Sequence, residues 1–243
     1  QLTQALGLTN AIHAHRRNRP YTMGSLYWQI DDVWPTVSWS SVDYFGNWKA
    51  AHYGVKKAFD PVLISPDVKD STLTITVVND KLKELSGTLF LDVFTLDGLR
   101  VFSTDNSVNI QDNSALSVYT ESTGELLCGQ NENNVYLSTY LVIGDTTLTE
   151  NIFYFVDPKY LKLKTPKFST SIKQNQNEWI VSLTASTLAK DVYLSFDTLI
   201  GKWTDNYFDL RSGVEKTVIF TPEIKIETPK PKLNIISLAD IIE

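Results

Sequence analysis

A short segment near the start of the chain, residues 27–35 (YWQIDDVWP), combines two indoles with an amide and two carboxylates. Its candidate binding residues are Trp28, Gln29, Asp31, Asp32 and Trp34. A flat indole beside carboxylates suits a carbohydrate, because the C–H face of a sugar ring stacks on the aromatic ring while its hydroxyls bond to polar groups. The structural alternative places both tryptophans in a core and uses the two aspartates to order a loop. Residue types alone leave both interpretations open.

The adjacent carboxylates Asp31 and Asp32 also have the chemistry of a general acid and a nucleophile, the pair that glycoside hydrolysis needs. Neighbouring side chains at the end of a strand point to opposite sides, so these two are not expected to flank one bond. We therefore assign no catalytic residue in this chain.

Histidine and cysteine form no recognisable metal or nucleophile pattern. His13 and His15 lie two residues apart on a predicted helix, so they do not face each other, and His52 falls on an apolar stripe. The single Cys128 has no histidine near it in the sequence and is expected to be a small buried group. No metal and no cofactor are expected.

The composition is that of an ordinary folded protein, with 243 residues of which 42% are hydrophobic and 21% are charged. The net charge of −6 argues against a nucleic-acid partner, which would favour a basic face. Apolar runs are far shorter than the roughly 18 residues that a membrane span needs, so no membrane partner is expected. The chain opens inside an amphipathic pattern, without a methionine or a signal peptide, and we expect it to be a piece of a longer protein.

The candidate segment lies in a pattern of alternating helix and strand. Gln1–Arg17 is predicted to be a helix that Pro20 ends, and Gly24–Ile30 is apolar on both faces, which favours a strand buried on both sides. A loop over Asp31–Gly46 and a helix over Trp48–Phe59 follow. This order is typical of an α/β barrel, whose active site is built at the C-terminal ends of its strands. Sixty residues are too few to close a barrel of about 250 residues, so domain 1–60 is expected to be the C-terminal end of one.

After residue 60 the apolar period changes from helical to strand-like. Alternating apolar residues predict strands at Leu73–Val77, Leu89–Val93 and Val135–Leu141. Asp97-Gly98 is a hairpin turn signal between such runs. Residues 61–160 are therefore predicted to form an immunoglobulin-like β-sandwich. Their net charge of −9, from five basic and fourteen acidic residues, is expected to be a solvated surface.

A second, smaller immunoglobulin-like sandwich is predicted over residues 161–243. Residues 158–166 are expected to be a strand or a linker, and a proline- and lysine-rich stretch occupies 228–232. Strands are predicted at Trp179–Ala185, Val192–Phe196, Val218–Phe220 and Leu233–Leu238. The predicted fold class is thus the end of an α/β barrel followed by two all-β sandwiches.

Several motifs in the first third of the chain resemble a known family. Residues 16–19 (RRNR) and 22–35 (TMGSLYWQIDDVWP) resemble the end of the catalytic barrel of β-mannosidases in glycoside hydrolase family two. The similarity continues through 38–49 (SWSSVDYFGNWK), 51–53 (AHY) and 61–65 (PVLIS), and is closer to the animal lysosomal type than to the bacterial type.

The resemblance implies two immunoglobulin-like sandwiches after the barrel, in agreement with the change of period. It also implies a retaining exo-enzyme that removes terminal, non-reducing β-D-mannose from oligosaccharides in the lysosome, with secretion as the alternative. The family's two catalytic glutamates are implied to lie upstream, since no glutamate occurs here before Glu84. The implied partners are a mannose-terminated oligosaccharide and the upstream part of the same enzyme, and this chain alone is expected to be inactive.

By the same resemblance, Trp28 matches the tryptophan on the last barrel strand that floors the sugar subsite and precedes a cis peptide. The family more often has Asn where this chain has Asp31, and Arg where it has Asn47. Asp32 and Trp34 are expected to order the loop or to line its rim.

Two other functions remain open: a non-catalytic carbohydrate-binding module, and a structural brace. A binding module would carry an exposed aromatic strip on a sandwich face. Trp179 and Trp203 are the only tryptophans available there, and Trp179 alternates with apolar residues as a core position would.

Overall fold

The computed structural model describes residues 1–224 and 231–242. The chain divides into two compact units, each built around one β-sandwich. One unit comprises residues 8–26 and 55–162, and the other comprises 1–7, 27–54 and 163–243. Residues 228–230 of the proline- and lysine-rich stretch lie outside the described residues.

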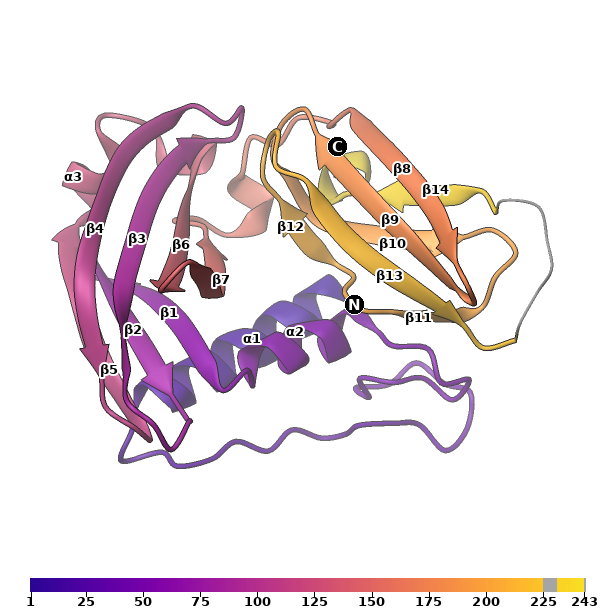
Figure 1. Cartoon of the computed structure of the whole chain (residues 1–243), viewed down its shortest axis with the longest axis horizontal. Helices are drawn as coiled ribbons and strands as arrows, with labels where there is room; N and C mark the ends of the chain where they lie inside the picture. The colour runs from indigo at the N-terminus through magenta and orange to yellow at the C-terminus, as the bar shows by residue number, and fades with distance from the viewer. Residues whose placement is uncertain (225–230, 243) are drawn as a thin grey trace. The chain divides into compact units, whose positions relative to one another are not determined.

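The first sandwich consists of two antiparallel sheets with strand orders β1-β2-β5 and β4-β3-β6-β7. Figure 1 shows β3 and β4 as long, curved neighbours. The strands are β1 (Val62–Lys69), β2 (Thr72–Asn79), β3 (Leu85–Thr95), β4 (Arg100–Ile110), β5 (Ser114–Ser122), β6 (Val135–Ile143) and β7 (Thr146–Phe153). The three strands predicted for residues 61–160 are all present as parts of β2, β3 and β6.

The alternation of apolar residues explains this sandwich. Side chains point to opposite faces along a strand, so every second residue of β2, β3 and β6 enters the space between the sheets. Ile75, Leu91 and Leu137 are fully buried there. The Asp97-Gly98 turn joins β3 to β4 as predicted, and Gly98 adopts a φ of 93° that favours glycine.

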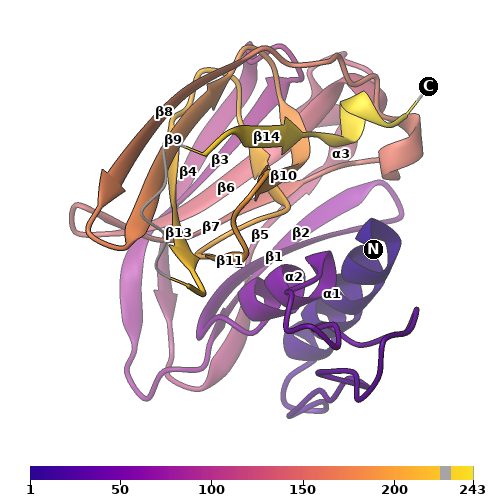
Figure 2. The same ribbon diagram turned by 90° about the vertical axis from the view of Figure 1, so that its right-hand side faces the viewer.

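Two helices precede the sandwiches. They are α1 (Leu2–Arg17) and α2 (Ala50–Ala58), and both were predicted from the helical spacing of apolar residues. Figure 2 shows them side by side near β1. The buried Arg16 of α1 donates to the carbonyl oxygens of Ala58 and Asp60 and forms a 3.0 Å ion pair with Asp80. These contacts fasten the end of α1 to the first sandwich.

His13 of α1 is also held against this sandwich, with its Nδ1 3.1 Å from the hydroxyl oxygen of Ser65. Burial, together with the charges of Arg17 and Arg16, lowers the pKa of His13 from 6.5 to about 4. Above pH 6.5 the residue is neutral in both folded and unfolded chains. Between pH 6.5 and 4 the unfolded chain binds a proton that the folded chain does not.

We therefore expect acid to destabilise the first sandwich through His13 by about 1.4 kcal/mol per pH unit in this interval. Thermal unfolding of the chain at pH 7.5 and 4.5 measures this effect. The loss between the two pH values should be smaller in His13→Asn than in the unchanged protein. His15→Asn, an exposed position on the same helix, is the control and should keep the full loss. An equal loss in the unchanged protein and His13→Asn would contradict the prediction.

The second sandwich consists of two sheets with strand orders β12-β10-β14 and β11-β13-β9-β8. Its strands are β8 (Phe168–Asn175), β9 (Glu178–Ala185), β10 (Ala189–Phe196), β11 (Gly201–Trp203), β12 (Phe208–Leu210), β13 (Lys216–Pro222) and β14 (Leu233–Ile236). The four predicted strands fall on β9, β10, β13 and β14, but β14 ends at Ile236 and the predicted Leu238 begins a 3₁₀ turn. In Figure 1, β8, β9 and β13 lie side by side.

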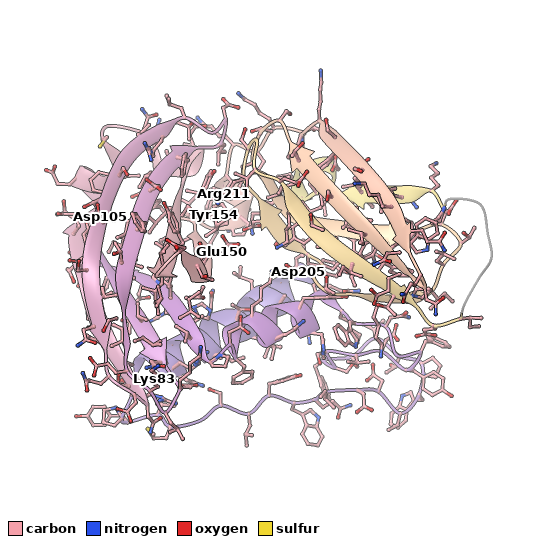
Figure 3. The ribbon with its side chains drawn as sticks, in the orientation of Figure 1. Lys83, Asp105, Glu150, Tyr154, Asp205 and Arg211 are labelled. Carbon is pink, nitrogen blue, oxygen red and sulfur yellow. The ribbon has the colours of Figure 1, made fainter. Side chains whose placement is uncertain are left out.

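Aromatic residues fill the core of the second sandwich. Trp203 packs against Phe196 and Phe220, with ring centroids 5.2 and 4.9 Å apart. Trp179 is buried in the same core, so the expectation that it is a core residue is confirmed. Asp205 (labelled in Figure 3) is partly buried and forms a 2.9 Å ion pair with Lys216.

The predicted buried strand Gly24–Ile30 is absent. These residues have no regular secondary structure, and Leu26 is fully exposed. A strand buried on both faces needs neighbours at both edges, and no strand within residues 1–224 and 231–242 lies beside this segment. The prediction that residues 1–60 form the end of a barrel is therefore wrong for this chain. These residues form two helices and a long loop.

Two smaller expectations concern residues 158–166 and Cys128. Residues 158–166 hold a short 3₁₀ turn, Pro158–Tyr160, and otherwise a linker. Cys128 is exposed, so its predicted burial is wrong. It follows the short helix α3 (Thr123–Leu127) in a left-handed conformation at the helix end, where the backbone reaches the surface.

The acidic residues of the first sandwich are mostly solvated. All but two of those between residues 61 and 160 are exposed, among them Asp105 on β4 and Glu150 on β7, both labelled in Figure 3. The expectation of a solvated acidic surface is confirmed. Among the described residues, no helix is long and apolar enough to cross a membrane.

Candidate carbohydrate site

The two candidate indoles lie at the surface. The side chains of Trp28 and Trp34 are 75% and 63% exposed, so neither is a core residue in this chain. Trp39 of the same loop is also exposed. An exposed indole presents an apolar ring to solvent, which is the feature that stacking on a sugar requires.

The backbone around Trp28 is held by a returning part of the loop. The Ser41 N–H donates to the Gln29 carbonyl oxygen at 3.1 Å, and the Val42 N–H donates to the Ile30 carbonyl oxygen at 2.7 Å. A parallel bridge joins Asp31 to Val42. The Trp28–Gln29 peptide is cis, as the resemblance implies.

Asp32 lies under the loop. Its carboxylate, with a side chain only 4% exposed, accepts hydrogen bonds from the hydroxyls of Ser38 and Ser40, both at 2.6 Å. The ammonium of Lys49 lies 3.4 Å from the same carboxylate and donates to Ser40 at 2.7 Å. The two serine hydroxyls and Lys49 lower the pKa of Asp32, so the group is ionised at neutral pH and only accepts hydrogen bonds.

Gln29 and Asp31 differ in exposure. The amide nitrogen of Gln29 donates to the Asp31 carbonyl oxygen at 2.8 Å, which closes a local turn within the segment. The Asp31 side chain is exposed. The structure therefore places Trp28, Asp31 and Trp34 at the surface, Gln29 partly buried and Asp32 beneath them.

Sequence reasoning missed the serines and the lysine that order this loop. Ser38, Ser40 and Lys49 surround Asp32, and Ser41 reaches back to Tyr27, with 2.9 Å between the two hydroxyl oxygens. The clustering of hydroxyl residues in 38–41 (SWSS) is the signal that could have found them. Such short side chains reach nearby backbone and carboxylates readily.

The three histidines do not come together. Nδ1 of His15 lies 2.9 Å from the Ser25 hydroxyl oxygen, and Nδ1 of His13 lies near Ser65. His52 packs on Trp48, with ring centroids 4.3 Å apart. No group of three or more histidine, cysteine, aspartate or glutamate residues in the described chain could hold a metal ion.

A cavity of about 380 Å³ lies in the unit that contains the second sandwich. Trp48, Tyr53 and Tyr207 line it, and Lys202 lies over the Trp48 ring. The Trp48 ring also contacts His52, and the Tyr207 hydroxyl donates to the Gln1 side chain. These groups already take part in packing and polar contacts of this unit, so we assign no ligand to the cavity.

Along the chain, a loop with exposed indoles is followed by two successive β-sandwiches, so the fold defines a chain with tandem immunoglobulin-like domains. Residues 71–160 match the Mannosidase Ig/CBM-like domain, and residues 163–241 match the Ig-fold domain of mannosidases. The chain belongs to the β-mannosidases of glycoside hydrolase family two, and it matches a C-terminal part of these enzymes.

Individual relatives agree with this family. The chain is 29% identical to goat β-mannosidase over 91% of its own length and 27% of the goat protein. It is 27% identical to β-mannosidase A of Neosartorya fischeri over 92% of its length and 26% of that protein. A crystal structure of a β-D-mannosidase from Dictyoglomus thermophilum superposes on 98% of the chain with a TM-score of 0.83 and 25% identity, and the match covers 29% of that enzyme. The chain thus spans about a quarter of the length of the curated relatives that it matches.

Proposed function

We propose that the chain is the C-terminal portion of a retaining exo-β-mannosidase that hydrolyses terminal, non-reducing β-D-mannose residues of oligosaccharides. The observation that carries this proposal is the match over nine-tenths of the chain to β-mannosidases, combined with exposed indoles on the loop that resembles the family's sugar subsite. Both catalytic glutamates lie upstream of residue 1 in this proposal, on the other strands of the barrel.

Residues 1–60 are proposed to complete the barrel when the upstream residues are present. The exposed apolar side chains of Leu26, Ile30 and Val33 would then be covered by neighbouring strands. The superposition of nearly the whole chain on the Dictyoglomus enzyme supports this, because it extends over the first 60 residues. The proposed domains are 1–60, 61–160 and 161–243, and the two family matches fall within the last two.

The proposed substrate-binding residues are Trp28, Gln29, Asp31, Asp32 and Trp34. Trp28 would form the floor of the subsite that holds the terminal mannose, and Trp34 would lie at its rim. The exposed carboxylate of Asp31 would accept hydrogen bonds from sugar hydroxyls. Asp32 would act indirectly, because Ser38 and Ser40 already bind its buried carboxylate.

A non-catalytic binding module receives less support. Both tryptophans of the second sandwich, Trp179 and Trp203, are buried, so neither can contribute to an exposed aromatic strip. A lysosomal location is proposed, with secretion as the alternative, and the goat and cow relatives support the animal type of enzyme.

The stereochemistry of hydrolysis tests this proposal. A full-length β-mannosidase containing this sequence is expected to release β-mannose first from an aryl β-mannoside, because a retaining enzyme inverts the anomeric centre twice. Proton NMR of the anomeric signals during the first minutes distinguishes β-mannose from the α-anomer that appears later by mutarotation. An aryl β-glucoside is the control substrate and should react more slowly. Initial release of α-mannose, or no hydrolysis of the mannoside, would refute the proposal.

A further inference from the structure

The buried side chain of Ser41 contacts the backbone of the segment that carries Trp28. We propose that Ser41 is a positioning residue that fixes the orientation of the Trp28 indole for sugar binding. This inference rests on the proposed function of Trp28. Ser41 itself is fully buried and would not touch the sugar.

The first support for this role is the set of backbone contacts that Ser41 makes. Its N–H donates to the Gln29 carbonyl oxygen at 3.1 Å, and its hydroxyl donates to the Ile30 carbonyl oxygen at 3.1 Å. The Ile30 oxygen also accepts the Val42 N–H at 2.7 Å. Two successive carbonyl groups that follow Trp28 are therefore fixed by residues 41 and 42.

The second support is the contact on the other side of Trp28. The hydroxyl oxygens of Ser41 and Tyr27 lie 2.9 Å apart. A serine hydroxyl has one proton to donate and two lone pairs to accept. Since it donates to Ile30, it accepts from Tyr27, and one side chain thus links the residues that precede and follow the exposed indole.

The third support is that Ser41 is joined to the packed core of the same unit. Its carbonyl oxygen accepts the Lys49 N–H at 2.9 Å, and Nδ1 of His52 lies 3.4 Å from its hydroxyl oxygen. The neighbours of Lys49 and His52 in the sequence, Trp48 and Tyr53, have rings 5.5 Å apart. Tyr53 is buried in the core of the second sandwich. The Trp28 segment is therefore anchored to that core through Ser41 and the start of α2.

Loss of the Ser41 hydroxyl should let Trp28 move without removing it. A displacement of about 1 Å at a binding group can cost on the order of 100-fold in rate, and a loosened group should cost less than a displaced one. We expect Ser41→Ala in a full-length β-mannosidase to raise KM for 4-nitrophenyl β-D-mannoside about tenfold, with a smaller change in kcat, because stacking acts on the bound substrate before the reaction.

A double-mutant cycle separates positioning from simple loss of structure. If Ser41 acts through Trp28, adding Ser41→Ala to Trp28→Ala should change kcat/KM less than twofold, since the group being positioned is already gone. The matched control is Ser65→Ala. Ser65 is also fully buried and contacts His13 and Arg17, but it belongs to the first sandwich. Ser65→Ala should leave KM unchanged.

A second variant keeps the test decisive if Ser41→Ala does not fold. Tyr27→Phe removes one partner of Ser41 and should raise KM about threefold, again with no effect in the Trp28→Ala background. The positioning role would be overturned if Ser41→Ala raised KM tenfold in the Trp28→Ala background as well. It would also be overturned if Ser41→Ala had no effect on KM when Trp28 is present. No effect of Trp28→Ala alone would instead overturn the proposed sugar site, so the two failures are distinguishable.

Discussion

The 243-residue chain, purified alone, is expected to hydrolyse no aryl β-mannoside above the uncatalysed background. A retaining glycosidase needs two carboxyl groups about 5–5.5 Å apart on either side of the bond that breaks. No glutamate precedes Glu84, and the aspartates of the candidate site, Asp31 and Asp32, are adjacent in sequence. Asp32 is buried beneath Ser38 and Ser40 and is held ionised, so it can neither donate a proton nor reach a sugar carbon.

The contrast with a complete enzyme should be very large, because enzymes commonly accelerate such reactions by 10⁶-fold or more. The measurement is release of 4-nitrophenol from 4-nitrophenyl β-D-mannoside by equal amounts of this chain and of a full-length β-mannosidase. Asp31→Ala and Asp32→Ala serve as controls for trace activity. Robust turnover by the chain that disappears in either variant would show that the catalytic carboxylates lie here after all.

The sandwiches could be predicted from sequence because their signal is local. In β3, Leu89, Leu91 and Val93 alternate with polar or partly exposed residues, and a strand places alternate side chains on one face whatever the rest of the chain does. The Asp97-Gly98 turn depends only on two residues. Pairing of β3 with β6, which is 40 or more residues away, agrees with the burial that both patterns require.

The strand Gly24–Ile30 could not be predicted reliably because its signal depends on absent neighbours. Its apolar residues on both faces indicate burial, yet burial comes from adjacent strands, and Leu26 is exposed in this chain. The sequence pattern indicates burial on both faces, as the segment would have in the proposed barrel. The structure describes the segment without that environment.

The arrangement of the candidate site was only partly predictable. The types of residue in the segment 27–35 left a sugar site and a structural role both open, and the exposure of Trp28 favours the sugar site. The burial of Asp32 depends on Ser38 and Ser40, which approach it because the chain turns back after Trp34. A tertiary contact of this kind has no periodic signature, so a single sequence does not reveal which of two adjacent aspartates is buried.

In a full-length β-mannosidase, Trp28→Ala is expected to damage catalysis far more than stability. The indole is three-quarters exposed, so its removal takes little surface from a core. It removes the surface on which the sugar is proposed to stack, and it leaves the sugar free to sit out of line with the nucleophile. Misplacement of this kind costs about 100-fold in kcat/KM, or about 2.7 kcal/mol of transition-state stabilisation.

Trp203→Ala is the matched control, because it removes the same side chain from the core of the second sandwich, where Trp203 is 5% exposed. That variant should lose about 3–5 kcal/mol of stability and should lose activity only in proportion to unfolded protein. The measurements are kcat/KM per folded molecule and the thermal midpoint of each variant. If Trp28→Ala instead lowers the midpoint as Trp203→Ala does, with activity per folded molecule near that of the unchanged enzyme, then Trp28 is a packing residue in the complete enzyme. In that case neighbours in the closed barrel must bury the indole that this chain exposes, and the sugar must be held by other side chains.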